Sequence, residues 1–186
     1  MRGEVFRNWG DTSYPVEYVY NSYGEKTELR TYRGGGGWAA ATWPGAAAST
    51  ADVTTWVYHT PTGLLDQKKD AANKAVIYSY DTLGRLLTRT WARGGATTYG
   101  YDPNSGELTG LTYPVGTPNV TFSYDRGGRQ SGVTDAAGTR TRTFNTVGAT
   151  LNEQFTAGML NGIQVTNSYD GLLRRQSLGA TMNATS

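Results

Sequence analysis

A short motif recurs along most of this chain of 186 residues. Its clearest copy runs from Tyr78 to Leu87 and consists of an aromatic residue, any residue, a second aromatic, Asp or Asn, two variable residues, Gly, a polar residue and an apolar one. The second aromatics of successive copies are Tyr20, Tyr58, Tyr80, Tyr101, Tyr124, Phe144 and Tyr169, so the steps are 38, 22, 21, 23, 20 and 25 residues. A period of 20–25 residues predicts a repeat architecture, in which one unit cannot bury its apolar face alone.

Each copy of the motif predicts a β-hairpin. Tyr78 and Tyr80 lie two residues apart and therefore share one face of a strand. Asp81 can accept hydrogen bonds from its own backbone and start a turn, Gly84 supplies a positive φ, and the apolar residues after Arg85 begin a return strand. The corresponding residues in the other clear copies are Tyr99, Tyr101, Asp102 and Gly106; Phe122, Tyr124, Asp125, Gly128 and Arg129; and Tyr169 and Asp170. We therefore predict an all-β chain of about seven hairpin-like repeats.

A second turn signature separates the copies. The segments 70–74 and 135–139 match closely, with Asn73 and Gly138 at the same position. Asn and Gly are the residues that most readily enter the left-handed region of backbone conformation. These segments predict the turns that join one hairpin to the next.

The repeat phase divides the chain into parts. Residues 1–15 are a lead-in with a partial strand around Glu4–Trp9, and residues 16–178 hold the repeats. A loop insertion near 33–52 contains four consecutive glycines and a Pro-Gly pair. One eroded repeat around Trp38–Trp43 is the alternative reading of that insertion. The polar tail, residues 179–186, is expected to be disordered.

Composition excludes several classes of function. The chain has 17 basic and 15 acidic residues and a net charge of +2. This small excess does not create an electrostatic field that would attract nucleic acid or an anionic membrane. It has no cysteine, so disulfides and thiolate metal sites are excluded. No apolar stretch has the length of a signal peptide or a transmembrane span.

Catalytic and metal sites lack support in the sequence. His59 is the only histidine, no nucleophile motif accompanies it, and Asp52 and Asp66 do not give it a metal-ligand spacing. The repeated aspartates could be viewed as the paired carboxylates of a glycoside hydrolase, but such an enzyme needs two carboxylates in different environments. We expect no cofactor and no metal, and a hydrolase remains a distant alternative.

The motif Tyr-x-Tyr-Asp-x-x-Gly-Arg-Leu, with an Asp-Ala-x-Gly turn between copies, resembles the RHS/YD-repeat family. Tyr78 to Leu87 and Phe122 to Arg129 match best, and the resemblance covers about residues 16–178. Gly63 and Gly106 come one residue late, and Leu173 stands where Gly belongs, which puts those individual turns in doubt.

The resemblance implies a twisted, spiralling sheet that is part of a β-shell around a C-terminal toxin or effector. Its partners would be the remaining repeats of the same polypeptide and the enclosed domain, and its location would be extracellular or at the cell surface. The chain itself would be non-catalytic wall material. The alternative is a cell-surface carbohydrate-binding or adhesion module, for which the candidate glycan contacts are Trp38, Trp43, Trp91 and Tyr113.

Overall fold

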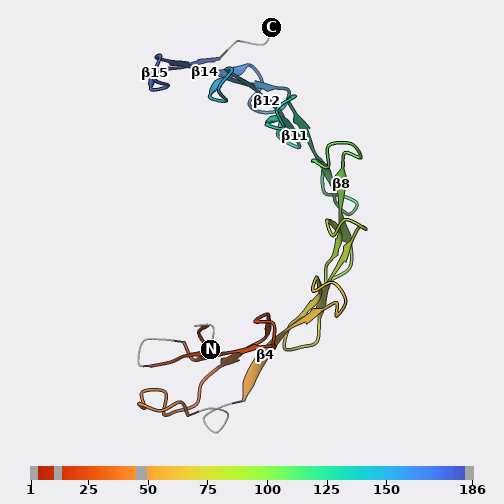
Figure 1. Ribbon diagram of the computed structural model, residues 1–186, viewed down its shortest axis with the longest axis vertical. Coiled ribbons are helices and arrows are strands. Elements are labelled where there is room, and N and C mark those ends of the chain that lie inside the picture. The colour runs from red at the N-terminus through yellow and green to blue at the C-terminus, as the bar shows by residue number, and fades with distance from the viewer. Residues whose placement is uncertain (1–3, 11–13, 45–49, 183–186) are drawn as a thin grey trace. The chain divides into compact units, whose positions relative to one another are not determined.

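The computed structural model describes residues 4–10, 14–44 and 50–182. It confirms the all-β prediction, because every regular element among these residues is an antiparallel β-strand and none is a helix (Figure 1). The chain forms two compact units, Met1–Ala96 and Thr97–Ser186.

In the first unit, each strand pairs antiparallel with the next one along the chain. Its strands are β1 (Arg7–Asn8), β2 (Val16–Tyr20), β3 (Lys26–Tyr32), β4 (Ala51–Tyr58), β5 (Leu65–Lys69), β6 (Ala75–Tyr80) and β7 (Leu86–Thr90). The repeat motif ends β2, β4 and β6, so each copy of the motif joins two strands of one hairpin.

The second unit continues the same pattern of antiparallel neighbours. Its strands are β8 (Ala96–Tyr101), β9 (Leu108–Thr112), β10 (Val120–Tyr124), β11 (Gln130–Asp135), β12 (Gly138–Phe144), β13 (Thr150–Thr156), β14 (Ile163–Tyr169) and β15 (Arg175–Met182). Here the motif ends β8, β10, β12 and β14.

A β-bulge lies at the same point of every hairpin. In β6 and β7, Ser79 pairs with Thr88 but Tyr80 pairs with Leu86, so one residue of the return strand is left over. The same shift precedes the second aromatic of the motif in the other six hairpins. Since a bulge bends its strand and increases the local twist, each hairpin bends at the same point, beside the second aromatic of the motif.

Very little of the molecule is buried. Tyr32, with 3% of its surface exposed, is one of the few buried residues of the described part of the chain. A single-layered sheet of this kind has no thick core, so its stability depends on turns, cross-strand pairs and small local clusters.

The structure refines the predicted boundaries. Among residues 33–44 and 50 the insertion has no strand between β3 and β4. The tail, by contrast, begins later than residue 179, because β15 pairs with β14 as far as Met182. The rest of the predicted disordered tail, residues 183–186, lies outside the described residues.

The two turns that link hairpins differ more than their sequences suggest. Asp70 accepts backbone hydrogen bonds from Ala72 and Lys74, and Asn73 has a φ of 60°. Asp135 instead pairs directly with Gly138 in a tighter turn, and Gly138 has a φ of 127°. Both positions enter positive φ as predicted, but the second turn closes with fewer residues.

Candidate functional site

The repeat turn is built around one carboxylate. The Oδ1 atom of Asp81 accepts hydrogen bonds of 2.9 Å from the backbone N–H groups of Leu83 and Arg85. A backbone hydrogen bond also closes the turn, because Gly84 N–H donates to the Asp81 carbonyl over 3.0 Å. Gly84 has a φ of 78°, a conformation in which a Cβ atom is disfavoured. The Asp81 side chain therefore stabilises the turn by accepting hydrogen bonds from the backbone of the residues that follow it.

The second oxygen of the same carboxylate binds arginine four residues later. Asp81 Oδ2 accepts a bond of 2.8 Å from Arg85 Nε. The equivalent distances are 2.7 Å from Arg129 Nε to Asp125 and 2.7 Å from Arg174 Nε to Asp170. Asn145 fills the aspartate position in another copy and retains the two backbone bonds, from Val147 and Ala149. The backbone acceptor is thus common to these turns, and the ion pair is added in some of them.

Two turns with a late glycine close in a slightly larger form. Gly106 N–H donates to the carbonyl of Asp102 over 2.9 Å, and Gly63 N–H donates to that of His59 over 2.8 Å. The extra residue lies within the turn, so the flanking strands keep the pairing seen in other hairpins. His59 Nδ1 lies 2.9 Å from Thr62 Oγ1, which places the single histidine in a local turn contact.

These hydrogen bonds lower the pKa of the turn aspartates. For Asp125 the largest cause is the Arg129 side chain, followed by its backbone N–H; for Asp170 the backbone N–H of Arg174 comes first, then its side chain. For Asp81, desolvation raises the pKa but the bonds from Arg85 and Leu83 outweigh it.

Acid should therefore destabilise the fold. Because the folded pKa of Asp125 lies below its ordinary value of 3.8, the stabilising contribution is present above that pH and is lost as the pH falls through the folded pKa. The denaturant midpoint should stay level from about pH 7 to pH 5 and fall below about pH 4. Urea unfolding followed by circular dichroism measures this, and Asp125→Asn should make the acid limb shallower. A midpoint that holds at about pH 3 would contradict the turn assignment.

Leu173 occupies the glycine position of its turn and still closes it. Its N–H donates to the Asp170 carbonyl over 3.0 Å, with a φ of 63°. A left-handed conformation costs a non-glycine residue about 1–2 kcal/mol. The sequence put this turn in doubt; the structure forms it at the expense of backbone strain.

Leu173→Gly should raise the free energy of unfolding by about 1 kcal/mol, because it relieves this strain and the leucine is 53% exposed. Leu172→Gly is the matched control, since Leu172 is 75% exposed and is not among the residues of positive φ. That control should be destabilising. Thermal and urea unfolding of both variants measures the difference, and equal effects would show that Leu173 is unstrained.

A tyrosine hydroxyl joins each of several hairpins to the strand before it. Tyr80 at the end of β6 donates to the carbonyl of Leu65, the first residue of β5, over 2.9 Å. The same bond runs from Tyr124 to Leu108 over 2.8 Å and from Tyr169 to Thr150 over 3.0 Å. In the N-terminal copies it runs from Tyr58 to Lys26 over 3.0 Å and from Tyr20 to Val5 over 3.2 Å.

The hydroxyl closes a seam that the backbone leaves open. Between β5 and β6 the backbone pairs only from Gln67 to Lys69, and between β9 and β10 only at Gly110 and Leu111. The strands are unpaired from there to the repeat turn, and the tyrosine bridges that gap. We call this hydroxyl-to-carbonyl contact the tyrosine bridge. Its donor is the second aromatic of the motif, but the sequence does not mark its acceptor, because that acceptor is a backbone carbonyl.

Tyr80→Phe should lower the free energy of unfolding by about 1 kcal/mol, the usual contribution of one hydrogen bond. Tyr78→Phe is the control on the same strand, because no hydrogen bond of its hydroxyl is present among the described residues. Urea unfolding should separate the two variants. If both lose the same stability, the bridge contributes nothing.

The aromatic residues of the loop insertion pack on one another. Trp38 and Trp43 have ring centroids 5.3 Å apart and lie 5.2 and 5.4 Å from that of Tyr32. Trp9 lies 5.3 Å from Trp43. The Tyr32 hydroxyl donates to Glu17 over 3.3 Å. We call Trp9, Tyr32, Trp38 and Trp43 the aromatic cluster.

The other two candidate glycan residues lie apart from this cluster. Trp91 follows β7 and carries the guanidinium of Arg89 at 3.8 Å from its ring centroid. Tyr113 follows β9 in the other unit, and its backbone N–H donates to Asn119 Oδ1 over 3.0 Å. Thus Trp38 and Trp43 come together, whereas Trp91 shares no contact with them among the described residues.

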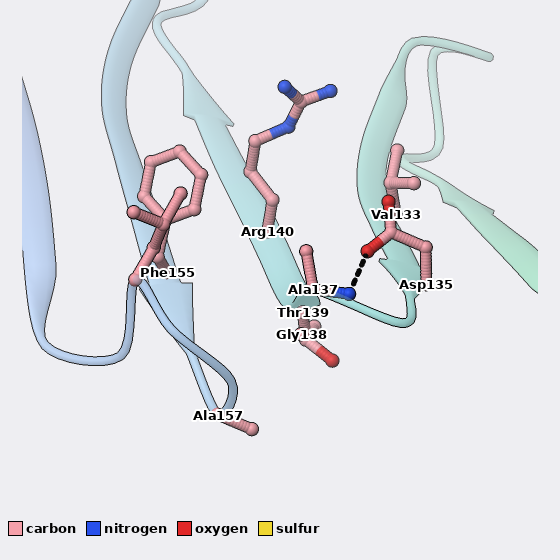
Figure 2. Close-up of a pocket in the computed structure, with 9 residues that line it drawn as sticks. Val133, Asp135, Ala137, Gly138, Thr139, Arg140, Phe155 and Ala157 are labelled. Atoms are coloured by element: carbon pink, nitrogen blue, oxygen red, sulfur yellow. Dashed lines mark hydrogen bonds between the residues drawn. The ribbon is translucent and has the colours of Figure 1, made fainter.

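A hollow of about 220 Å³ lies beside the turn between β11 and β12 (Figure 2). Val133, Phe155 and Leu160 supply its apolar lining. Its polar groups are engaged elsewhere, since Asp135 Oδ1 accepts a bond of 2.8 Å from Ala137 N–H (Figure 2), and Arg140 Nε lies 3.3 Å from Glu153. The hollow contains no nucleophile, acid and base in a catalytic arrangement.

The family model of the RHS repeat matches the stretch from the turn before β9 to β12. The match covers residues 105–140. The matched stretch contains the hairpin of β10 and β11 with the Asp125 turn, and the match bears out the resemblance predicted from the sequence. No curated protein matches the chain.

Solved structures share the fold at low sequence identity. The crystal structure of TcdB2-TccC3-TEV matches with a TM-score of 0.67 and 11% identity, over 95% of this chain and 10% of that chain. The Photorhabdus luminescens Tc holotoxin pore matches with 0.64 and 12%, over 91% and 9%. The crystal structure of TcdB2-TccC3-Cdc42 matches with 0.54 and 14%, over 98% and 12%. The chain therefore spans about a tenth of the length of these proteins, and the likeness establishes the fold.

Proposed function

We propose that this chain is a non-catalytic structural segment of a larger RHS/YD-repeat protein and forms part of the wall of a shell. The observation that carries the proposal is the repeated joint: turn, bulge and tyrosine bridge recur from one hairpin to the next. Such a joint extends a sheet by identical steps without building a core, as the wall of a shell requires. An active site, by contrast, needs groups in different environments.

The state of the turn carboxylates supports a role without catalysis. Asp81 and Asp125 each accept two backbone bonds and one arginine bond, which occupies both oxygens. Their lowered pKa is the opposite of what a general acid needs near neutral pH. A glycoside hydrolase would need one of these groups to retain a proton.

The larger protein would enclose a C-terminal toxin or effector and act outside the producing cell. Support comes from the likeness to chains of Tc toxin assemblies, of which this chain covers about a tenth. Among the described residues, no helix is long and apolar enough to cross a membrane.

Mass spectrometry and limited proteolysis of the native gene product test this proposal. We expect a product much longer than 186 residues, with further repeats followed by a domain that resists protease until mild denaturation. The same domain expressed alone is the control and should be cut at once. A native product that lacks such a domain, or in which that domain is cut as fast as the control, would overturn the containment role.

A further inference from the structure

The hollow beside the turn between β11 and β12 has the size and lining of a site for a small ligand. Val133 pairs with Arg140, and Arg140 pairs with Phe155, so the three side chains share one face of three neighbouring strands (Figure 2). Leu160, in the loop between β13 and β14, completes the apolar lining. The hollow has a volume of about 220 Å³. Since an apolar cavity of about 150 Å³ accepts benzene, one aromatic ring with a short substituent fits here.

Backbone contacts fix the shape of this hollow. Gly158 lies so close to the neighbouring turn that an added Cβ atom would collide with the carbonyl of Ala137. Gly138 lies against the carbonyl of Ala157 in the same way. The two turns that border the hollow are therefore locked together through backbone atoms. A site that is formed before its ligand arrives loses little affinity to ordering on binding.

One residue of the lining has a strained backbone. Ala157 has a φ of 62°, in the left-handed region that a residue with a Cβ atom rarely adopts. Its N–H donates to Asn161 Oδ1 over 3.0 Å, which stabilises the loop in this form. Backbone strain of this kind is concentrated at ligand-binding and catalytic sites. The repeat turns described above do not require it, so Ala157 indicates a role for the hollow itself.

The charge near Arg140 is positive. Arg140 Nε lies 3.3 Å and Arg142 Nε 3.1 Å from the same oxygen atom of Glu153, so two guanidinium groups share one carboxylate. Neither arginine pairs with a second carboxylate within the described part of the chain. One positive charge is therefore not neutralised by an ion pair. Arg140 lines the hollow, and its guanidinium has five N–H donors, of which Glu153 occupies one.

A negative charge lies at the other end of the lining, at the turn. Asp135 pairs with Gly138, two positions along the strands from the pair of Val133 and Arg140. Its Oδ1 atom accepts the N–H of Ala137 over 2.8 Å, so this carboxylate is held to the turn (Figure 2). The lining is thus negative at the turn and positive at Arg140. An anionic ligand would be oriented with its charged group toward Arg140.

We propose that this hollow binds a small aromatic carboxylate. The ring lies among Val133, Phe155 and Leu160, where aromatic and aliphatic contacts remove it from water. The carboxylate binds the Arg140 guanidinium, whose planar N–H groups match its two oxygens. Charge complementarity therefore identifies an anion, and the volume identifies a single ring. The site lies within the second unit and does not depend on the containment role proposed above.

Titration of the isotope-labelled chain with phenylacetate, followed by amide NMR, tests the proposal. Saturable shifts are expected at Ala137, Ala157 and Leu160, with a Kd on the order of 1 mM for a ligand of this size. Phenylacetamide has the same ring without the charge and should bind about fivefold more weakly, the effect of losing one exposed ion pair. Phenethylamine, which carries a positive charge, should bind more weakly still.

Two pairs of variants separate the charge from the apolar lining. Arg140→Met should weaken phenylacetate binding about fivefold and leave phenylacetamide unchanged. Its control is Arg175→Met, which removes the same charge from β15, outside the lining. Leu160→Ala should weaken both ligands about fivefold by removing apolar contact. Its control is Met159→Ala, because Met159 is adjacent, 93% exposed and outside the lining. Both controls should change affinity by less than about twofold, and the amide spectra report whether each variant is folded.

Four outcomes would overturn the proposal. Absence of saturable shifts in the wild-type chain at about 10 mM phenylacetate would remove the site. Binding of phenethylamine or phenylacetamide as tight as that of phenylacetate would show that the site does not select an anion. Equal weakening by Arg140→Met and Arg175→Met would indicate a diffuse charge effect. Equal affinities of the Leu160→Ala and Met159→Ala variants would show that the ring does not occupy the hollow.

Discussion

Replacing Tyr32 by Ala should lower the free energy of unfolding by about 3–5 kcal/mol, the range for removing a buried aromatic side chain. Tyr32 is 3% exposed and lies at the centre of the aromatic cluster, with Trp38 and Trp43 on its ring. Its hydroxyl donates to Glu17, which also accepts bonds from Arg7 and Arg30. Because few other side chains are buried, the neighbouring residues cannot readily move in to fill the cavity that Tyr32→Ala would leave.

Urea unfolding monitored by tryptophan fluorescence measures this loss, because Trp9, Trp38 and Trp43 report on the cluster directly. Tyr23→Ala is the control for the loss of a tyrosine, since Tyr23 is 77% exposed at a turn. It should cost less than about 0.5 kcal/mol. A Tyr32 variant as stable as this control would show that the cluster does not hold the insertion to the sheet.

Replacing Gly158 by Ala should lower the free energy of unfolding by about 3 kcal/mol. Gly158 has a φ of 67°, and an added Cβ would meet the carbonyl oxygen of Ala137 at an impossible distance. Gly138 faces the carbonyl of Ala157 in the same way, so two turn tips interlock through backbone alone. Left-handed strain contributes about 1–2 kcal/mol and the clash with unyielding backbone adds about as much again.

Gly171→Ala is the matched control, because its Cβ would meet nothing within 4 Å and its φ is not positive. Differential scanning calorimetry of the two variants should show a clear fall in Tm for Gly158→Ala and little change for Gly171→Ala. If Gly158→Ala unfolds at the wild-type temperature, the two turns do not interlock. Phe155 and Leu160 line the adjacent hollow. Their solvent exposure should therefore rise in the Gly158→Ala variant.

The sequence was informative wherever a residue type has a local physical role. The aromatic pair, the aspartate and the glycine each act within six residues, so the hairpins and their repeat turns could be predicted. The departures were informative as well: Gly63 and Gly106 close a larger turn, and Leu173 closes an ordinary one under strain.

Contacts between distant residues could not be predicted in this way. The tyrosine bridge ends on a backbone carbonyl, and the interlocked glycines depend on a second turn about twenty residues away. The tight turn at Asp135 was also missed, because its sequence resembles that at Asp70 while the opposing loop sets its geometry.

The tyrosine bridge has a consequence for how such chains change in length. Its acceptor is a main-chain carbonyl, and the residues that supply it differ from one seam to the next: Val5, Lys26, Leu65, Leu108 and Thr150. A seam therefore places almost no demand on the side chains of the hairpin it joins. At seams that contain the bridge, a hairpin that is duplicated or exchanged should therefore form the same contact with its new neighbour.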